Sequence, residues 1–337
     1  HNLGLRADGS IVAWGDNRIG ECDVPEPNSG FAAIAAGLGH SLAASNYVRA
    51  QLENEARSKF ERQAREIHRA IEARLTSYTG LLSGMRGLYR ASDGVAHREF
   101  REYVRSLELA ARYPAVRVIN FAEYVTPGRK AAFERRLRQD NSVRPGGYPA
   151  FAVKPPGQRN EYHVLTYMEP FEPYLAVFGN DLLRMPNSML EELRLSGDFI
   201  SSGTVVKHQA GLPLALRLAV YQPAKNGDGA GDIFIGSLGM GFSLIDLMHE
   251  AVSPAVLSSM RIRIHNIGRS GSSIRASPGE ENLLIDTSSL AGPEARKPLA
   301  QQEGAGRIFS TNTQLDFGGA LLQLSFDAPA RLIAAPL

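Results

Sequence analysis

Residues 46–90 read NYVRAQLENEARSKFERQAREIHRAIEARLTSYTGLLSGMRGLYR. Apolar residues recur in this stretch every three or four positions, 41 residues in 11 steps, with an average spacing of 3.7. That spacing is typical of an α-helix, and nine Arg or Lys and five Glu occupy its other faces. We therefore expect a helix buried along one uncharged stripe. The stripe consists of Val48, Leu52, Ala56, Phe60, Ala64, Ile67, Ile71, Leu75, Tyr78, Leu82, Met85 and Tyr89.

The length of this helix predicts a stalk that packs against several layers of structure. From Asn46 to Thr79 the helix would extend about 50 Å. Gly80, Gly84 and Gly87 follow, and because glycine weakens helices we expect a break or a packing crossing near them. A coiled-coil seam is the alternative interpretation, although the spacing fits a strict heptad poorly.

Short helices and strand-like runs alternate after the stalk. Helices are expected around 100–107, 127–137 and 189–195, and Gly197 is suited to end the last of them. Short helices inserted among antiparallel strands predict a fold of the α+β class. The expected strands are 116–125, 162–170, 204–206, 212–221, 233–240, 260–265 and 321–326, and the segment 268–306 is expected to be a mobile loop.

Composition and charge exclude several kinds of protein. The 37 Lys and Arg and 35 Asp and Glu leave a net charge of +2, too small to drive binding to nucleic acid. The single cysteine, Cys22, allows neither an intramolecular disulfide nor a zinc site. No apolar run reaches the length of about 18 residues that a membrane span needs. We expect a soluble piece of a longer protein whose membrane segments flank it.

Motifs that would indicate an enzyme are missing from the sequence. It contains no Gly-x-Ser-x-Gly elbow, no phosphate-binding loop and no His-Glu-x-x-His pair. The segment 226–232 is rich in Gly and Asp, but Ser237 stands where a calcium loop has its last acidic ligand. We therefore expect no catalytic residue, no bound metal and no cofactor.

The N-terminal segment has a pattern of its own. Asp8-Gly9 predicts a hairpin turn between apolar strands. Residues 13–17, Ala-Trp-Gly-Asp-Asn, and 33–37, Ala-Ile-Ala-Ala-Gly, resemble one repeat of the regulator-of-chromosome-condensation propeller family. Since one blade cannot bury its faces without neighbours, we expect residues 1–44 to form a partial propeller-type repeat, a remnant or a fusion junction.

A second resemblance spans most of the chain. Residues 46 to about 252 resemble a CHASE domain, the extracellular sensor of plant cytokinin receptors and of many bacterial sensor kinases and cyclic-di-GMP enzymes. The order and spacing of several motifs carry this resemblance. They include Gly87-Leu88-Tyr89-Arg90-Ala91-Ser92, Asn120-Phe121-Ala122-Glu123-Tyr124-Val125, Tyr162-His163-Val164-Leu165-Thr166-Tyr167-Met168-Glu169-Pro170 and Gly179-Asn180-Asp181.

The resemblance implies a domain plan. It predicts a long N-terminal stalk helix followed by two PAS-like subdomains with antiparallel sheets. We expect stalk and capping helices in 45–113, a membrane-distal, ligand-binding subdomain in 114–241 and a membrane-proximal subdomain in 242–337.

The resemblance also implies a ligand site in the first subdomain. The candidate ligand-binding residues are Tyr167, Ser188, Lys207, Leu216 and Arg217. Cytokinin-type receptors have an aspartate near the place of Ser188, a leucine at that of Lys207 and a threonine at that of Arg217. Two cations would favour an anionic ligand over an adenine-like one by charge-assisted hydrogen bonding. Arg217 alternates with the leucines of its strand, so it faces either solvent or the ligand.

These observations predict the extracytoplasmic small-molecule sensor domain of a transmembrane receptor of the histidine kinase or cyclic-di-GMP type. Ligand binding would be transmitted through the stalk helix, which is also a candidate homodimer contact. The membrane is expected only through flanking segments, and nucleic acid is not an expected partner. A protein–protein interaction module that uses the propeller edge and the long helix is the alternative.

Overall fold

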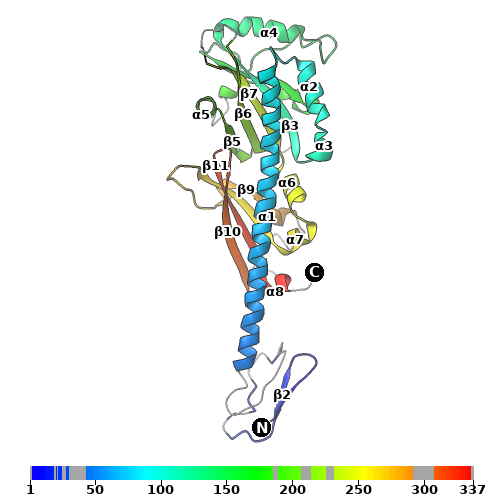
Figure 1. Cartoon of the computed structure of the whole chain (residues 1–337), viewed down its shortest axis with the longest axis vertical. Helices are drawn as coiled ribbons and strands as arrows, with labels where there is room; N and C mark the ends of the chain where they lie inside the picture. Colours follow the sequence, from blue (N-terminus) through cyan, green and yellow to red (C-terminus); the bar gives the residue numbers. More distant parts are fainter. Residues whose placement is uncertain are drawn as a thin grey trace. The chain divides into compact units, whose positions relative to one another are not determined.

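A computed structural model describes residues 2–18, 20, 22–24, 28–29, 43–184, 189–205, 214–224, 231–290 and 307–334 (Figure 1). The chain forms two compact units. The smaller comprises His1–Ala64, Pro298–Phe309 and Ala328–Leu337, and the larger comprises Arg65–Lys297 and Ser310–Asp327. The fold is α+β, with a long helix and antiparallel sheets, as the sequence predicts. The domain boundaries expected at 44, 113 and 241 stay predictions.

The long helix α1 spans Ala43–Ala91. Its apolar stripe is buried from Ala56 through Tyr89, whereas Leu52 is 58% exposed. The predicted break at the three glycines is wrong, because the helix continues through Gly80, Gly84 and Gly87. Leu82, Met85 and Tyr89 are buried around these glycines, and their packing offsets the cost of about 1 kcal/mol that each glycine adds.

A five-stranded antiparallel sheet follows in the order β4-β3-β7-β6-β5. One of its faces packs against α1, since the Tyr89 ring stacks on Phe121 of β3 at 4.5 Å and the Tyr78 ring lies 5.3 Å from Phe242 of β7. The residues that alternate along the strands with Phe121 and Phe242 lie on the opposite face. The strands are β3 (Val116–Val125), β4 (Tyr162–Glu169), β5 (Phe199–Val205), β6 (Leu214–Gln222) and β7 (Ile233–Phe242).

A four-stranded antiparallel sheet has the order β10-β11-β8-β9. It also lies alongside α1 (Figure 1), where His68 Nδ1 is 2.9 Å from Thr313 Oγ1. The predicted loop over 268–306 is partly wrong, because Leu283–Asp286 forms β9 and pairs with β8; residues 291–306 lie outside the described part. The remaining strands are β8 (Arg261–Arg269), β10 (Ile308–Phe317) and β11 (Ala320–Pro329).

Short helices connect the strands. The predicted end of α5 at Gly197 is confirmed, since Gly197 adopts a left-handed conformation with a φ of 63°. The α-helices are α2 (His97–Ser106), α3 (Leu109–Arg112), α4 (Lys130–Gln139), α5 (Leu190–Ser196), α6 (Leu244–Ala251), α7 (Pro254–Ser259) and α8 (Ala330–Ala334). The 3₁₀ helices are η1 (Pro127–Arg129), η2 (Glu172–Val177), η3 (Leu182–Arg184), η4 (Glu280–Asn282) and η5 (Thr287–Ser289).

The smaller unit contains the N-terminal hairpin and the first part of α1. Strands β1 (Asn2–Leu5) and β2 (Ile11–Trp14) pair antiparallel, and the predicted Asp8-Gly9 turn is confirmed. Elsewhere in this unit, the Phe60 ring packs against Phe309 at 5.8 Å. No helix in the described part of the chain combines the length and the hydropathy that a bilayer span requires.

A buried carboxylate joins three elements of the larger unit. Glu250 of α6 accepts hydrogen bonds from the Tyr78 hydroxyl of α1 at 3.1 Å and from the Ala115 N–H at 2.6 Å. Arg74 of α1 lies 3.5 Å away, and only 6% of the Glu250 side chain is exposed. Burial, followed by the negative charge of Glu250, raises the pKa of the Tyr78 hydroxyl. Glu250 therefore links the stalk helix to the segment between the two sheets.

We predict that Glu250→Ala lowers the free energy of unfolding by about 2–4 kcal/mol, because two buried donors lose their acceptor. Glu250→Gln keeps an acceptor and should lose less. Urea unfolding followed by circular dichroism measures both. Glu66→Ala, an exposed position on α1, is the control and should change the free energy by less than about 0.5 kcal/mol. Equal losses for Glu250→Ala and Glu66→Ala would contradict the role of Glu250.

Candidate functional site

The structure does not bring the five predicted ligand residues together. Ser188 and Lys207 lie outside the described residues. Residues that pair across neighbouring strands share a face of the sheet. Tyr167 of β4 pairs with Phe121, which contacts α1, so Tyr167 faces α1. Leu216 of β6 is on the same face, because it pairs with Met240 and Met240 pairs with Ile119. Arg217 lies on the opposite face, as the alternation with leucines predicts. A site built on this sheet therefore cannot use all of these side chains from one side.

Tyr167 belongs to an aromatic cluster under α2. Its ring stacks on His97 at 4.7 Å and lies 5.7 Å from the Phe100 ring. Burial raises the pKa of Tyr167 to about 12. Burial also lowers the pKa of His97, although Asp140 lies 3.2 Å from its Nδ1. The cluster is 95% or more buried at both Tyr167 and His97, which suits a core better than a ligand contact.

Arg217 is the centre of a polar cluster on the opposite face. Its Nη1 donates to Ser237 Oγ of β7 at 2.6 Å, and its Nη2 donates to Asn120 Oδ1 of β3 at 2.7 Å. The Ser237 hydroxyl also lies 2.9 Å from Nε2 of His163, on β4. Four neighbouring strands thus contribute one polar side chain each. Below, "the Arg217 cluster" means Asn120, His163, Arg217 and Ser237.

A glycine makes this arrangement possible. Gly239 of β7 pairs with Arg217 on one side and Asn120 on the other. A Cβ at Gly239 would lie 2.5 Å from Asn120 Oδ1 and 2.8 Å from Arg217 Nη2. The guanidinium therefore crosses β7 through the space that a side chain would fill, and it reaches the next strand.

The positive charge of Arg217 has no counter-charge among the residues that the structure describes. Burial lowers the pKa of Arg217 to about 10, and no acidic side chain in the described part of the chain pairs with it. Burial, and then the positive charge of Arg217, lower the pKa of His163 well below its usual range. His163 is therefore neutral at pH 7, and the cluster holds one positive charge next to neutral oxygens. Arg217 is half-buried, and a partly desolvated cation without a counter-charge is less stable than one that an anion joins.

A cavity lies next to the cluster on the same face of the sheet, although none of the four cluster residues lines it. The His163 ring lies 6.1 Å from Phe234, which packs against Tyr221 at 5.4 Å. These two aromatic rings line a cavity of about 790 Å³, within the range of small-molecule sites. Helix α5 forms another wall, because Leu190 and Leu193 pack in one core cluster with Ala219 of β6. The cavity is also lined by Glu161, Leu183, Glu191, Arg194, Leu195 and Asp232.

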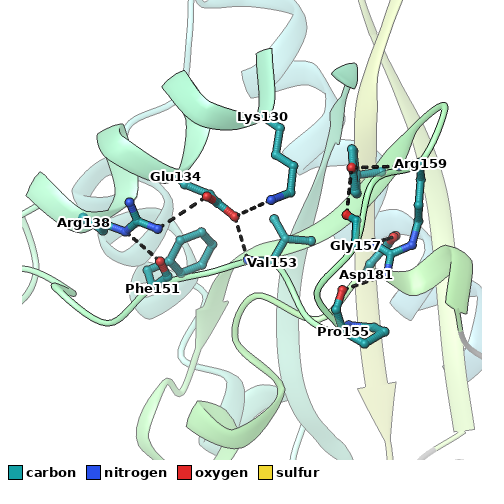
Figure 2. A network of polar contacts seen from close by, with 10 residues as sticks. Lys130, Glu134, Arg138, Phe151, Val153, Pro155, Gly157, Arg159 and Asp181 are labelled. Carbon is teal, nitrogen blue, oxygen red and sulfur yellow. Dashed lines mark hydrogen bonds and ion pairs between the residues drawn. The ribbon is translucent and has the colours of Figure 1, made fainter. Parts of the chain in front are cut away.

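A fully buried carboxylate fixes the strand that carries His163. Asp181 accepts from the His163 N–H at 3.0 Å and from the Leu183 N–H at 3.2 Å, and Arg159 lies 3.3 Å away. Figure 2 shows Arg159 reaching Asp181 and the Pro155 carbonyl, and Glu134 of α4 joined to Lys130, Arg138 and the Val153 N–H. The Asp181 contacts fix the start of β4, which carries His163, and the Glu134 contacts fix the segment around Val153.

Sequence reasoning missed Asn120, His163, Ser237 and Gly239 as members of the cluster. The available signal was the presence of polar residues or glycine inside strands that are otherwise apolar. No group of His, Cys, Asp or Glu among the described residues has the arrangement of a metal site.

We predict that Gly239→Ala displaces the Arg217 side chain and lowers the free energy of unfolding by about 1–3 kcal/mol, because the added methyl overlaps the guanidinium. The loss should shrink in an Arg217→Ala background, which a double-mutant cycle measures. Gly128→Ala, where a Cβ meets nothing within 4 Å, is the control. An unchanged loss in the Arg217→Ala background would rule out the close approach.

Comparison with known proteins places the chain in a family. The CHASE domain family model matches residues 93–284, more than half of the chain. No curated protein matches the chain. Residues 1–44 lie outside the match, and the propeller-type repeat remains a prediction without support.

Several solved structures are similar at low identity. One is an extracellular ligand-binding receptor from Desulfohalobium retbaense, with 12% identity, a TM-score of 0.37 and coverage of 82% of this chain. The alignment spans only 39% of that receptor. The ligand-binding domain of the Pseudomonas aeruginosa amino acid chemoreceptor PctC, in complex with GABA, has 11% identity and a TM-score of 0.36, with 77% of this chain and 94% of that chain covered. A domain of a putative sensory box/GGDEF protein from Vibrio parahaemolyticus has 12% identity and a TM-score of 0.38, with 85% and 99% covered.

CHASE domains are extracellular ligand-binding sensor domains. The family match covers α2, the whole five-stranded sheet and the cavity beside the Arg217 cluster. The chain belongs to the CHASE domain family and is a sensor domain.

Proposed function

We propose that this sensor domain binds a small organic anion on the face of the five-stranded sheet that lies opposite α1. The observation that carries the proposal is the Arg217 guanidinium. Burial disfavours its charge, and its hydrogen-bond partners among the described residues are the neutral oxygens of Asn120 and Ser237. A carboxylate supplies the missing negative charge, and its hydrogen bonds to a guanidinium are stronger than those between neutral groups. The ligand group that Arg217 selects is therefore anionic.

The rest of the ligand is proposed to be an apolar body of moderate size. Tyr221, Phe234 and Leu190 give the cavity aromatic and aliphatic walls. Apolar walls with a few fixed polar groups are typical of small-molecule sites. Among the five residues that the family resemblance indicates, Arg217 is retained in this site. Tyr167 and Leu216 face α1 and are not part of it.

The position of the domain in its receptor follows from its family. We propose that it is the extracytoplasmic part of a transmembrane receptor of the histidine kinase or cyclic-di-GMP type, and that membrane segments flank it. The long helix α1 is one proposed path toward those segments, and it is also the proposed contact of a homodimer. Analytical ultracentrifugation of the chain tests the dimer, since a monomer at all concentrations would rule it out.

We predict that carboxylates raise the thermal midpoint of the chain and that matched neutral amides do not. Acetate, pyruvate, succinate and benzoate are compared with acetamide, pyruvamide, succinamide and benzamide in a thermal-shift assay. An acid present at about 100 times its dissociation constant adds about 2.7 kcal/mol, which is a readily measured shift. Equal shifts from acids and amides would contradict an anion site.

Arg217→Gln should abolish the shift produced by the acids, because glutamine can donate hydrogen bonds but carries no charge. The control is Arg112→Gln, which removes a charge from an exposed pair with Glu108 and should leave the shift intact. Circular dichroism verifies that both variants are folded. An acid that stabilises wild type and Arg217→Gln equally binds elsewhere, and the proposed site would then be wrong.

A further inference from the structure

We propose that helix α5 and strand β5 carry ligand occupancy at the Arg217 cluster to the four-stranded sheet, through direct contacts that bypass α1. This inference rests on the proposed function for its biological meaning. The mechanical link itself is a separate property of the ligand-free chain, and it is tested without a ligand.

Helix α5 has contacts on two sides. One side contacts the face of the five-stranded sheet that lies opposite α1, called the ligand face below. The other side contacts the four-stranded sheet, called the second sheet below. Leu190 and Leu193 are 5% and 2% exposed and pack with Ala219, two residues along β6 from Arg217. Glu192, on the other side of the helix, forms an ion pair with Arg269 at the end of β8. A change in the position of α5 on the ligand face therefore also moves the Glu192 side chain, which is paired with Arg269 of the second sheet.

Strand β5 makes a parallel set of contacts. It is the last strand of the five-stranded sheet, and Ile200 of β5 is the pairing partner of Arg217. The Ser201 N–H donates to the Gly318 carbonyl, in the turn between β10 and β11, at 2.8 Å. Asn266 Nδ2 of β8 donates to the Gly203 carbonyl at 2.7 Å. The edge of the first sheet is thus bonded to two places in the second.

Two glycines allow the backbones of β5 and the second sheet to approach closely. A Cβ at Gly318 would lie 2.6 Å from the Ser201 nitrogen and 3.0 Å from Leu216 Cδ1. A Cβ at Gly203 would lie 2.6 Å from Asn266 Nδ2. Because Gly318 and Gly203 have no side chain of their own to absorb a displacement, a shift of β5 is passed on at these two contacts.

The structure also offers a competing path through α1. Arg86 of α1 donates to the Gly197 carbonyl at the end of α5 at 3.2 Å, so the helix could respond to the same movement. The two paths differ in which amides change their protection. The direct path affects β8, β10 and β11, and the helix path affects Arg65–Ala91.

The experiment is hydrogen exchange of the whole chain, read by mass spectrometry, for Leu193→Ala. This change opens a cavity beneath α5 on the ligand face. We expect exchange in β8 and β11 to rise about fivefold or more, as local stability falls. In a Glu192→Ala/Arg269→Ala background, the rise in those strands should fall to less than half. Leu175→Ala, at a position 46% exposed in η2 and outside the lining of the cavity, is the control and should change neither sheet.

Three results would overturn the proposal: a rise confined to the first sheet, a rise in α1 with β8 unchanged, or an equal rise in the Glu192→Ala/Arg269→Ala background. Leu193→Val replaces Leu193→Ala if the latter does not fold. None of these outcomes depends on the identity of the ligand. Failure of the link and failure of the anion site therefore give different results, since the latter is decided by the acids and Arg217→Gln.

A second pair of variants tests the glycine contact from the other sheet. Gly318→Ala should raise exchange in β5, because the new methyl overlaps the Ser201 nitrogen. Gly271→Ala is the matched control. Gly271 has a positive φ of 78°, comparable to the 55° of Gly318, but a Cβ added at Gly271 would meet no atom within 4 Å. Equal exchange in β5 for the two variants would show that β5 and the β10–β11 turn are not coupled.

Discussion

The structure depends on the burial of one uncharged stripe along α1. From Ala56 to Tyr89 every residue of the stripe is buried, and in the larger unit both sheets lie against this helix. Because one face of the five-stranded sheet is covered in this way, period-two alternation assigns Leu214, Leu216 and Leu218 to the helix side. The residues between them, Arg217 included, are left for the opposite face. The stripe thus decides where a polar site can form.

Both sheets lie against α1, and both have arginines on their strands, but Arg217 differs from the others in its partners. On β8, Arg261 pairs with Asp286, and Arg263 pairs with Asp327 at 2.8 Å. Hydrogen bonding to Asp286 raises the pKa of Arg261, the opposite of what happens at Arg217. Arg117 of β3, in the first sheet, is likewise paired with Asp246, so among these strand arginines it is Arg217 that lacks a carboxylate partner. That difference is a physical reason to assign anion sensing to the first sheet and a structural role to these arginines of the second.

Local patterns predicted most of the fold but little of the site. The 3.7-residue period identified the buried stripe, and β3, β6, β7, β8 and β11 coincide with predicted runs to within a few residues. The predicted helix break failed because tertiary packing outweighs the weak helix propensity of three glycines. The Arg217 cluster depends on strand order and register, which join Asn120 to a residue 97 positions away. Alternation predicts which face Arg217 occupies, but it cannot show that Asn120 is its neighbour on the far side of Gly239.

Helix α5 is a suitable moving part because it is short. Its seven residues are too few to form a stable helix alone, so its position depends on what it packs against. Those partners are the ligand face, through Leu190 and Leu193, and the second sheet, through Glu192. An anion at Arg217 changes the electrostatics of the first partner while the second stays the same. The proposed link requires the equilibrium position of α5 to shift in response, and the contact with Arg269 is the route by which such a shift would reach the second sheet.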